Sequence, residues 1–337
     1  NPLLFRPATP EDVPPFNRIE AAHFEPAVDA ALERAYANLA EIRAVPVDEA
    51  DFNNVIVPLE TCSEMLERIL RIFYGLMGAE TNDELNALSE IFGPKQARLA
   101  NDILLDPEIM ARVERVHRHE DRSMLSTEQI TLLEESYDSF RRGGAHLPEG
   151  KQAELREIDA RMSTLSPKFQ QNVLKATNAF EFWLSNDEEI AGLPDTALKA
   201  AQSAAQKHDA PKGAYLFTLH QPSLVPFLTY AKRRDLREQM WRAFNDLGTE
   251  GETDNKPLIL EIIGLRWRKA HLLGKADIAT HILEKRMAGS PATVREFLAD
   301  LQHYYKPAAE KDLADLQALA EELDNVDEIQ PWDVMYY

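Results

Sequence analysis

Apolar residues recur at spacings of three and four along much of the chain, which is the repeat of an amphipathic helix. After Pro26 the repeat predicts a helix with one buried stripe, formed by Val28, Leu32, Ala35, Leu39 and Ile42. A second repeat is typical of a short heptad seam and comprises Leu155, Ile158, Met162, Leu165 and Phe169. Pro167 lies inside this seam and is expected to kink or restart the helix.

Residues typical of helix ends indicate where several helices begin and stop. Asp106-Pro107 predicts an N-cap followed by proline in the first turn, and Ser126–Gln129 predicts a capping box. Gly143-Gly144 predicts a left-handed stop. Ser290-Pro291 predicts the start of a long helix that Pro307 is expected to bend. The apolar positions of this last helix are Val294, Phe297, Leu298, Leu301, Tyr304 and Tyr305.

Two stretches rich in aromatic and branched residues, Phe180–Leu184 and Tyr215–Leu219, resemble strands. An alanine-rich helix is expected between them, at about Asp195–His208, so the two strands can pair as a small patch. Glycine contributes only 13 of 337 residues, which disfavours a turn-rich sandwich or barrel. The expected fold class is mainly α with a small β patch.

Charge and cysteine content limit the partners and the compartment. The chain carries 57 acidic and 37 basic residues, a net charge of −20, which repels phosphate backbones and anionic lipid. We therefore expect no nucleic-acid and no membrane partner. Cys62 is the single cysteine, which excludes internal disulfides and a thiolate zinc cage. With no signal peptide in Asn1–Phe5 and no long apolar run, we expect a cytoplasmic protein.

The metal-binding signature H-E-x-x-H is absent from the chain. His119 is followed by Glu120, but Ser123 stands where the second imidazole would have to be. The chain also lacks a G-x-S-x-G elbow, a P-loop and a G-x-G-x-x-G fingerprint. We therefore predict that it contains no catalytic, cofactor-binding or metal-binding residue.

Two Glu-x-x-His pairs, Glu20/His23 and Glu114/His117, have the spacing that di-iron bundles use. We interpret them as ordinary polar side chains, since pairs of this kind also arise by chance, and the di-iron site is the less favoured alternative. His117 follows Val113 by four residues, which indicates a satisfied histidine at the edge of the core.

Two further features also have a structural interpretation. Cys62 lies on a predicted helix, where a buried structural thiol is favoured over a catalytic one. The segment Lys232–Glu238 mixes charges of both signs and predicts a salt-bridged helix face. On its chemistry alone the chain is a helical scaffold.

Strings in a fixed order along the whole chain resemble the N-terminal half of the thimet oligopeptidase, oligopeptidase A and peptidyl-dipeptidase family of zinc metallopeptidases. They are Pro15–Ile19, His23–Ala27, Phe52–Glu60, Asn101–Asp106, Phe140–Ala145, Leu165–Leu174, Gln221–Ser223, Leu236–Glu238, Asp254-Asn255, Leu265–Gly274 and Pro331–Asp333 with Tyr336-Tyr337. The resemblance is strongest to the peptidyl-dipeptidase or oligopeptidase A branch.

The resemblance implies a multi-helix N-terminal lobe of a neurolysin-like zinc oligopeptidase. It also implies that Zn²⁺, the catalytic residues and the substrate-binding residues belong to a C-terminal half beyond this chain. By this resemblance the chain supplies one wall of a channel that admits short peptides, and alone it is inactive. The expected regions are helical 1–177, a small α/β element 178–220 and helical 221–337. The alternative is a non-catalytic helical binding or scaffold protein.

Large apolar or aromatic side chains fill five of the last six positions, namely Trp332, Val334, Met335, Tyr336 and Tyr337. Free tails are usually polar and poorly ordered. We therefore expect Asp333 to cap a helix and this segment to pack against the C-terminal half. Without that half, the segment should fold back onto the helical body or expose a patch that favours self-association.

Overall fold

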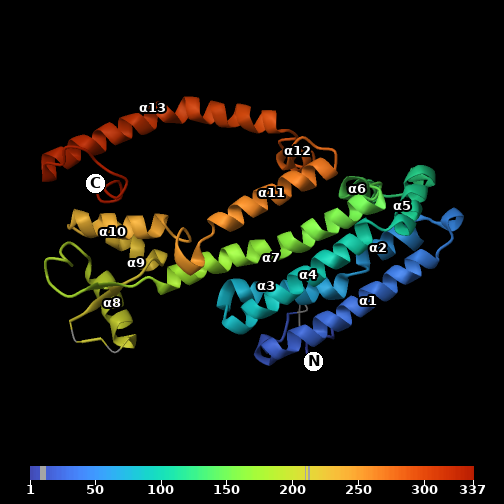
Figure 1. Ribbon diagram of the computed structural model, residues 1–337, viewed down its shortest axis with the longest axis horizontal. Coiled ribbons are helices and arrows are strands. Elements are labelled where there is room, and N and C mark those ends of the chain that lie inside the picture. Colours follow the sequence, from blue (N-terminus) through green and yellow to red (C-terminus); the bar gives the residue numbers. More distant parts are fainter. Residues whose placement is uncertain (8–12, 209, 212) are drawn as a thin grey trace. The chain divides into compact units, whose positions relative to one another are not determined.

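The computed structural model describes residues 1–7, 13–208, 210–211 and 213–337. Its helices are α1 (Phe24–Ala44), α2 (Val57–Thr61), α3 (Glu64–Glu80), α4 (Asp83–Leu104), α5 (Pro107–His119), α6 (Thr127–Gly143), α7 (Glu149–Ala179), α8 (Asp195–Lys207), α9 (Gln221–Tyr230), α10 (Arg234–Asn245), α11 (Lys256–Leu272), α12 (Ile278–Leu283) and α13 (Pro291–Asp324). The strands are β1 (Phe182–Leu184) and β2 (Tyr215–Phe217). The prediction of a mainly α fold with a small β patch is confirmed (Figure 1).

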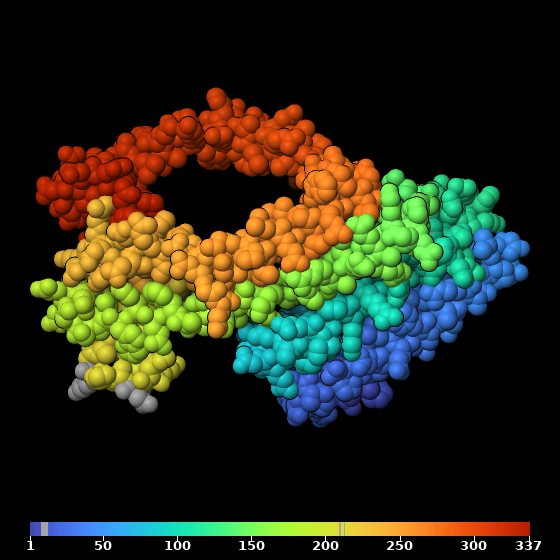
Figure 2. Space-filling model, viewed as in Figure 1, coloured from blue at the N-terminus to red at the C-terminus, as the bar shows by residue number. Residues whose placement is uncertain are grey.

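The chain forms two compact units, whose residues can be followed by colour in Figure 2. Unit 1 comprises Asn1–Pro167 and Gly264–Ile278, and unit 2 comprises Lys168–Ile263 and Ala279–Tyr337. The boundaries between the units fall within α7 and α11 and at the start of α12. The division of the sequence into regions 1–177, 178–220 and 221–337 stays a prediction.

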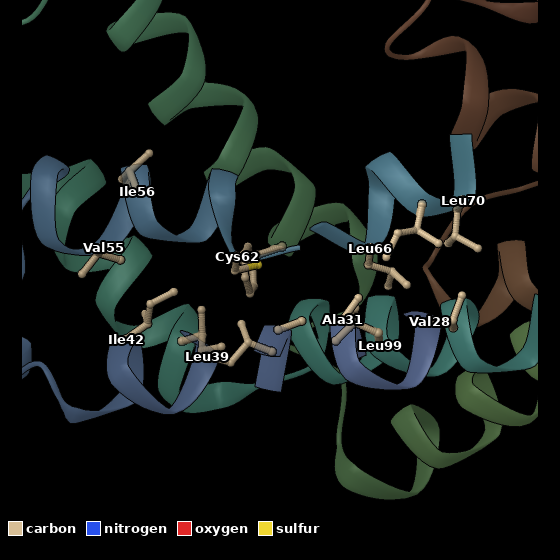
Figure 3. Close-up of a cluster of buried hydrophobic side chains, with 14 of the residues drawn as sticks. Val28, Ala31, Leu39, Ile42, Val55, Ile56, Cys62, Leu66, Leu70 and Leu99 are labelled. Carbon is tan, nitrogen blue, oxygen red and sulfur yellow. The ribbon is translucent and has the colours of Figure 1, made fainter. Parts of the chain in front are cut away.

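The core of unit 1 is built on the buried face of α1, which packs against α3 and α4 (Figure 1). Seven of its residues are buried, including Val28, Leu39 and Ile42 of the predicted stripe. Figure 3 shows Leu39 and Ile42 pointing toward the segment that carries Val55 and Cys62. The periodicity of the sequence therefore identified the face that the fold buries.

The predicted helix ends are confirmed. Asp106 accepts hydrogen bonds from the backbone N–H groups of the first turn of α5, and Ser126 forms a capping box at the start of α6. Gly144 ends α6 with φ of 102°, a left-handed conformation that glycine adopts without a Cβ penalty. Ser290 caps α13 by accepting from the N–H of Thr293.

Proline does not end the two long helices. α7 runs through Pro167 and α13 runs through Pro307, so the prediction that the chain restarts its helix at Pro167 is wrong. A proline removes one backbone donor, and the turns on both sides of it keep their own hydrogen bonds. The expected bends stay a prediction.

Unit 2 contains the two-stranded antiparallel sheet, in which Phe182 pairs with Phe217 and Leu184 pairs with Tyr215. Helix α8 packs on β2, and the side chains beneath join a core with α9 and α10. Phe227 of α9 lies at its centre, edge-to-face with Phe217 at 4.9 Å between ring centroids. The predicted strands and the alanine-rich helix are thus confirmed.

Candidate functional site

The two Glu-x-x-His pairs make local contacts within unit 1. The backbone N–H of Glu20 donates to Nδ1 of His23 at 3.1 Å, which closes a short 3-10 turn before α1. The carboxylate of Glu114 pairs with Arg118, one turn further along α5. In these contacts the residues support turns and helices, as the structural interpretation predicts.

His117 lies at the edge of the core, as its spacing from Val113 predicts. Its ring stacks on Tyr137 at 4.0 Å and 12°, and its Nε2 lies 2.9 Å from Oε2 of Glu134. Arg122 donates to the other oxygen of the same carboxylate at 2.6 Å. These contacts hold α5 against α6.

The lone His-Glu dipeptide also serves the scaffold, since Glu120 accepts the backbone N–H of Phe52 at 3.1 Å while His119 is exposed. Across the part of the chain that the structure describes, no three His, Cys, Asp or Glu side chains come together as metal ligands would. The donor set present in these described residues therefore does not fit a zinc ion.

Cys62 is buried, with 5% of its surface exposed, as expected for a structural thiol. Burial raises the pKa of the thiol, which lowers its reactivity. The predicted position on a helix is wrong, because Cys62 follows the end of α2 and lies in the turn before α3. The side-chain amide of Asn38 donates to its carbonyl oxygen at 2.9 Å and holds this turn to α1.

A buried ion pair ties the last residues to α10 within unit 2. The carboxylate of Asp333 is 0% exposed and accepts from Arg237 at 2.8 Å and from Arg234 at 2.7 Å. It also accepts the backbone N–H of Gln330 at 2.9 Å. Burial alone would raise the pKa of Asp333, but these hydrogen bonds outweigh it and hold the pKa below its usual value.

Arg237 corrects the prediction of a salt-bridged surface for Lys232–Glu238. Its side chain is only 1% exposed and also donates to the carbonyl of Ala231 at 2.7 Å. The surface pairing holds for Arg233 with Asp235. A signal for the burial was present, because Arg237 stands beside Leu236 and three residues before Met240, both of which are buried.

The segment 332–337 folds back onto unit 2, which confirms one of the two expected outcomes. Trp332 is 8% exposed and packs edge-on against Trp241, with 5.8 Å between ring centroids. The guanidinium of Arg237 lies 3.9 Å from the ring centroid of Tyr336. The prediction that Asp333 caps a helix is wrong, because its carboxylate pairs with the arginines and 331–336 forms turns.

The apolar face of α13 is exposed, in contrast to that of α1. Phe297 is 60% exposed and Leu298 55%, and one to two turns later Tyr304 is 75% exposed and Tyr305 68%. Of the 34 residues of this helix only Ala320 is buried. An amphipathic helix with a solvated apolar face indicates an interaction surface.

Helix α11 has apolar residues on two opposite sides. On one side Leu265 is buried, and Lys269 and Arg268 form ion pairs with acidic residues of α7. On the other side Leu260 is 73% exposed and Trp267 is 58% exposed. Large apolar side chains that share one exposed face indicate a candidate interface, so this second face is one as well.

Comparison with known proteins gives the chain a family. The sequence model described as Peptidase family M3 matches residues 227–337. Oligopeptidase A of Escherichia coli (strain K12) is 32% identical over 342 residues, covering 100% of this chain and 49% of that protein. Dipeptidyl carboxypeptidase of the same organism is 29% identical over 338 residues, with 100% and 49% covered. Saccharolysin of Saccharomyces cerevisiae is 26% identical over 299 residues, with 86% and 41% covered.

The chain belongs to peptidase family M3, and it aligns with the N-terminal half of these relatives. It spans about half the length of the curated relatives that it matches. The predicted resemblance to the oligopeptidase A and peptidyl-dipeptidase family is therefore confirmed. Among the described helices, none is long and apolar enough to cross a membrane.

Proposed function

We propose that this chain is the N-terminal, channel-wall portion of a zinc-dependent oligopeptidase, of the oligopeptidase A or peptidyl-dipeptidase kind, that hydrolyses short peptides. The observation that carries the proposal is the alignment of the whole chain with 49% of oligopeptidase A and of dipeptidyl carboxypeptidase. The zinc ligands and the catalytic residues then belong to the C-terminal half. That half and short peptides are the proposed partners.

In this proposal the helices of the chain restrict access to the active site and hold no metal themselves. The residues that the structure describes do not fit zinc, which supports this division of roles. We propose that the chain alone is inactive and that the enzyme works in the cytoplasm, as the name of a related cytosolic oligopeptidase A indicates for that protein. The net charge of −20 disfavours nucleic acid and anionic membranes as partners.

The test is reconstitution from two polypeptides. The chain is co-expressed with the polypeptide encoded after Tyr337 in the same reading frame, and hydrolysis of a quenched fluorescent peptide is measured. We expect activity from the complex that a chelator removes and zinc restores, because the metal supplies the hydrolytic water. The chain alone should contain no stoichiometric zinc after dialysis and should not hydrolyse the peptide.

Three controls separate this function from a non-catalytic scaffold. They are the chain alone, the second polypeptide alone and the complex without zinc. A stop codon directly after Tyr337 in the natural gene, or an inactive zinc-loaded complex, would contradict the proposal and favour the scaffold. Chelator-sensitive hydrolysis by the chain alone would contradict the assignment of the catalytic residues to the other half.

A further inference from the structure

We propose that the exposed apolar face of α13 is the docking surface for the C-terminal half of the polypeptide, and that the final segment 332–337 is not the main contact. We call this face the α13 stripe, formed by Phe297, Leu298, Leu301, Tyr304 and Tyr305. The proposal rests on the proposed function, since that function supplies the partner. The sequence alone predicted that the last residues pack against the C-terminal half, and the proposal assigns this contact to a face of α13.

The residues of the α13 stripe form one continuous face. Leu298, Leu301 and Tyr305 follow one another at spacings of three and four, and Phe297 and Tyr304 flank them on the same side. Four of the five side chains are more than half exposed. Three of these four are aromatic, and an aromatic side chain presents about 150–250 Å² for burial, so together the three leave on the order of 400 Å² of surface in water. That is about half of the ~800 Å² that each partner contributes to a stable interface.

The final segment 332–337 exposes less apolar surface, because two of its aromatic side chains already pack against α10. Trp332 is packed on Trp241, and Tyr336 lies over Arg237. Within this segment the exposed large apolar side chains are only Val334, which is 43% exposed, and Met335, which is 44% exposed. The segment is therefore fastened to α10, whereas the described residues of unit 2 place no such cover over the α13 stripe.

The location of the exposed surface indicates which partner covers it. Most of the exposed large hydrophobic side chains among the described residues lie within 227–337, which is the part matched by the family model. The relatives that share this part are about twice as long as the chain. The exposed apolar side chains thus lie in the part that this chain shares with relatives twice its length. This location fits a surface that the C-terminal half buries.

Charge disfavours a second copy of this chain as the occupant. Helix α13 carries eight acidic and three basic residues, so two copies facing each other would bring like charges together. The whole chain has a net charge of −20, which adds repulsion between copies at longer range. The proposed partner surface is therefore apolar, with basic residues at its rim.

The test compares variants of the stripe with matched controls in the two-polypeptide system. Leu298→Gln and Tyr305→Gln each place a polar group within the stripe, one toward either end of it. Because both side chains are largely exposed, the isolated chain should keep its melting temperature. We expect each variant to weaken association with the C-terminal half by about tenfold or more, as measured by titration calorimetry. Met124→Gln, at an 80% exposed position in unit 1, should leave the affinity within about twofold.

The possible outcomes are distinct. If the wild-type chain associates and the stripe variants bind equally well, the docking surface is wrong while the proposed function stands. If Val334→Gln with Met335→Gln weakens binding and the stripe variants do not, the final segment is the contact and the inference fails. If the variants abolish a dimer of the chain detected by sedimentation, a second copy is the occupant. A wild-type chain that binds no C-terminal half overturns the proposed function together with this inference.

Discussion

Replacing Asp333 by asparagine tests the buried ion pair that holds the last residues to α10. The substitution keeps the size of the side chain and one acceptor oxygen but removes the negative charge. Arg237, 1% exposed, is then left without its counter-charge, whereas Arg234, 41% exposed, can still be solvated. The perturbation therefore falls mainly on one buried guanidinium.

The expected cost is about 3 kcal/mol of unfolding free energy, since breaking a buried pair by removing one partner costs about 3–5 kcal/mol. Asparagine retains part of the hydrogen bonding, so the lower end of that range applies. Asp235→Asn is the matched control, because Asp235 pairs with Arg233 on the surface, where the side chains are 54% and 44% exposed. An exposed pair of this kind contributes about 0–1 kcal/mol.

The assay is urea unfolding followed by tryptophan fluorescence, because Trp241 and Trp332 pack against each other beside the ion pair. The two variants and the wild-type chain are compared at neutral pH and at acidic pH. Because the folded pKa of Asp333 lies below its usual value of 3.8, the stabilisation is present above that pH and is lost as the pH falls through the folded pKa. The difference between wild type and Asp333→Asn should therefore shrink below about pH 4.

Equal, small losses of stability in Asp333→Asn and Asp235→Asn would refute the reasoning, because they would mean that burial adds nothing to the pair. A difference that stays constant down to pH 2 would contradict the assignment of the effect to the Asp333 carboxylate.

Three further predictions follow from single positions. Cys62 should react with an alkylating reagent at least about tenfold more slowly in the folded chain than in urea, because burial hides the thiol and raises its pKa. Burial and a hydrogen bond to the Asp324 carboxylate raise the pKa of Tyr337 to about 12. In an alkaline titration followed by phenolate absorbance, the wild-type chain should therefore show one tyrosine that ionises near pH 12, and Tyr337→Phe should lack it. The raised pKa stabilises the fold below pH 10, and this contribution is lost toward pH 12. Gly192→Ala should destabilise by about 2 kcal/mol or more in chemical denaturation, because φ is 89° and a Cβ would lie 2.3 Å from the carbonyl oxygen of Tyr230. Gly150→Ala, with open space around the new methyl group, should be neutral or stabilising by up to about 1 kcal/mol.

The secondary structure was largely predictable because its determinants are local. The cap at Ser126, the stop at Gly144 and the strand pair near Phe182 depend on contacts within a few residues or on one short pairing. The residue types that form caps and stops are neighbours in the sequence, so they can be recognised without the tertiary structure. The same holds for the buried stripe of α1, whose spacing alone shows which face is apolar.

Partnerships across long stretches of sequence were decided by the tertiary structure. Arg237 and Asp333 are 96 residues apart, and nothing in the local charge pattern distinguishes Arg237 from the surface arginine at 233. Only the packing of the final segment on α10 buries this arginine and makes a counter-charge necessary. The arginine partners of Asp333 also lie far away in the sequence, so the local pattern alone predicted, wrongly, that Asp333 caps a helix.

By itself, the sequence determined that α13 is a long helix with one apolar face, because that follows from the spacing of its residues. The tertiary structure decided that unit 2 leaves this face exposed while the last residues fold back onto α10. The physical reason is that the spacing of apolar residues shows which side of a helix is hydrophobic. Whether that side is buried depends on which other segments pack against it.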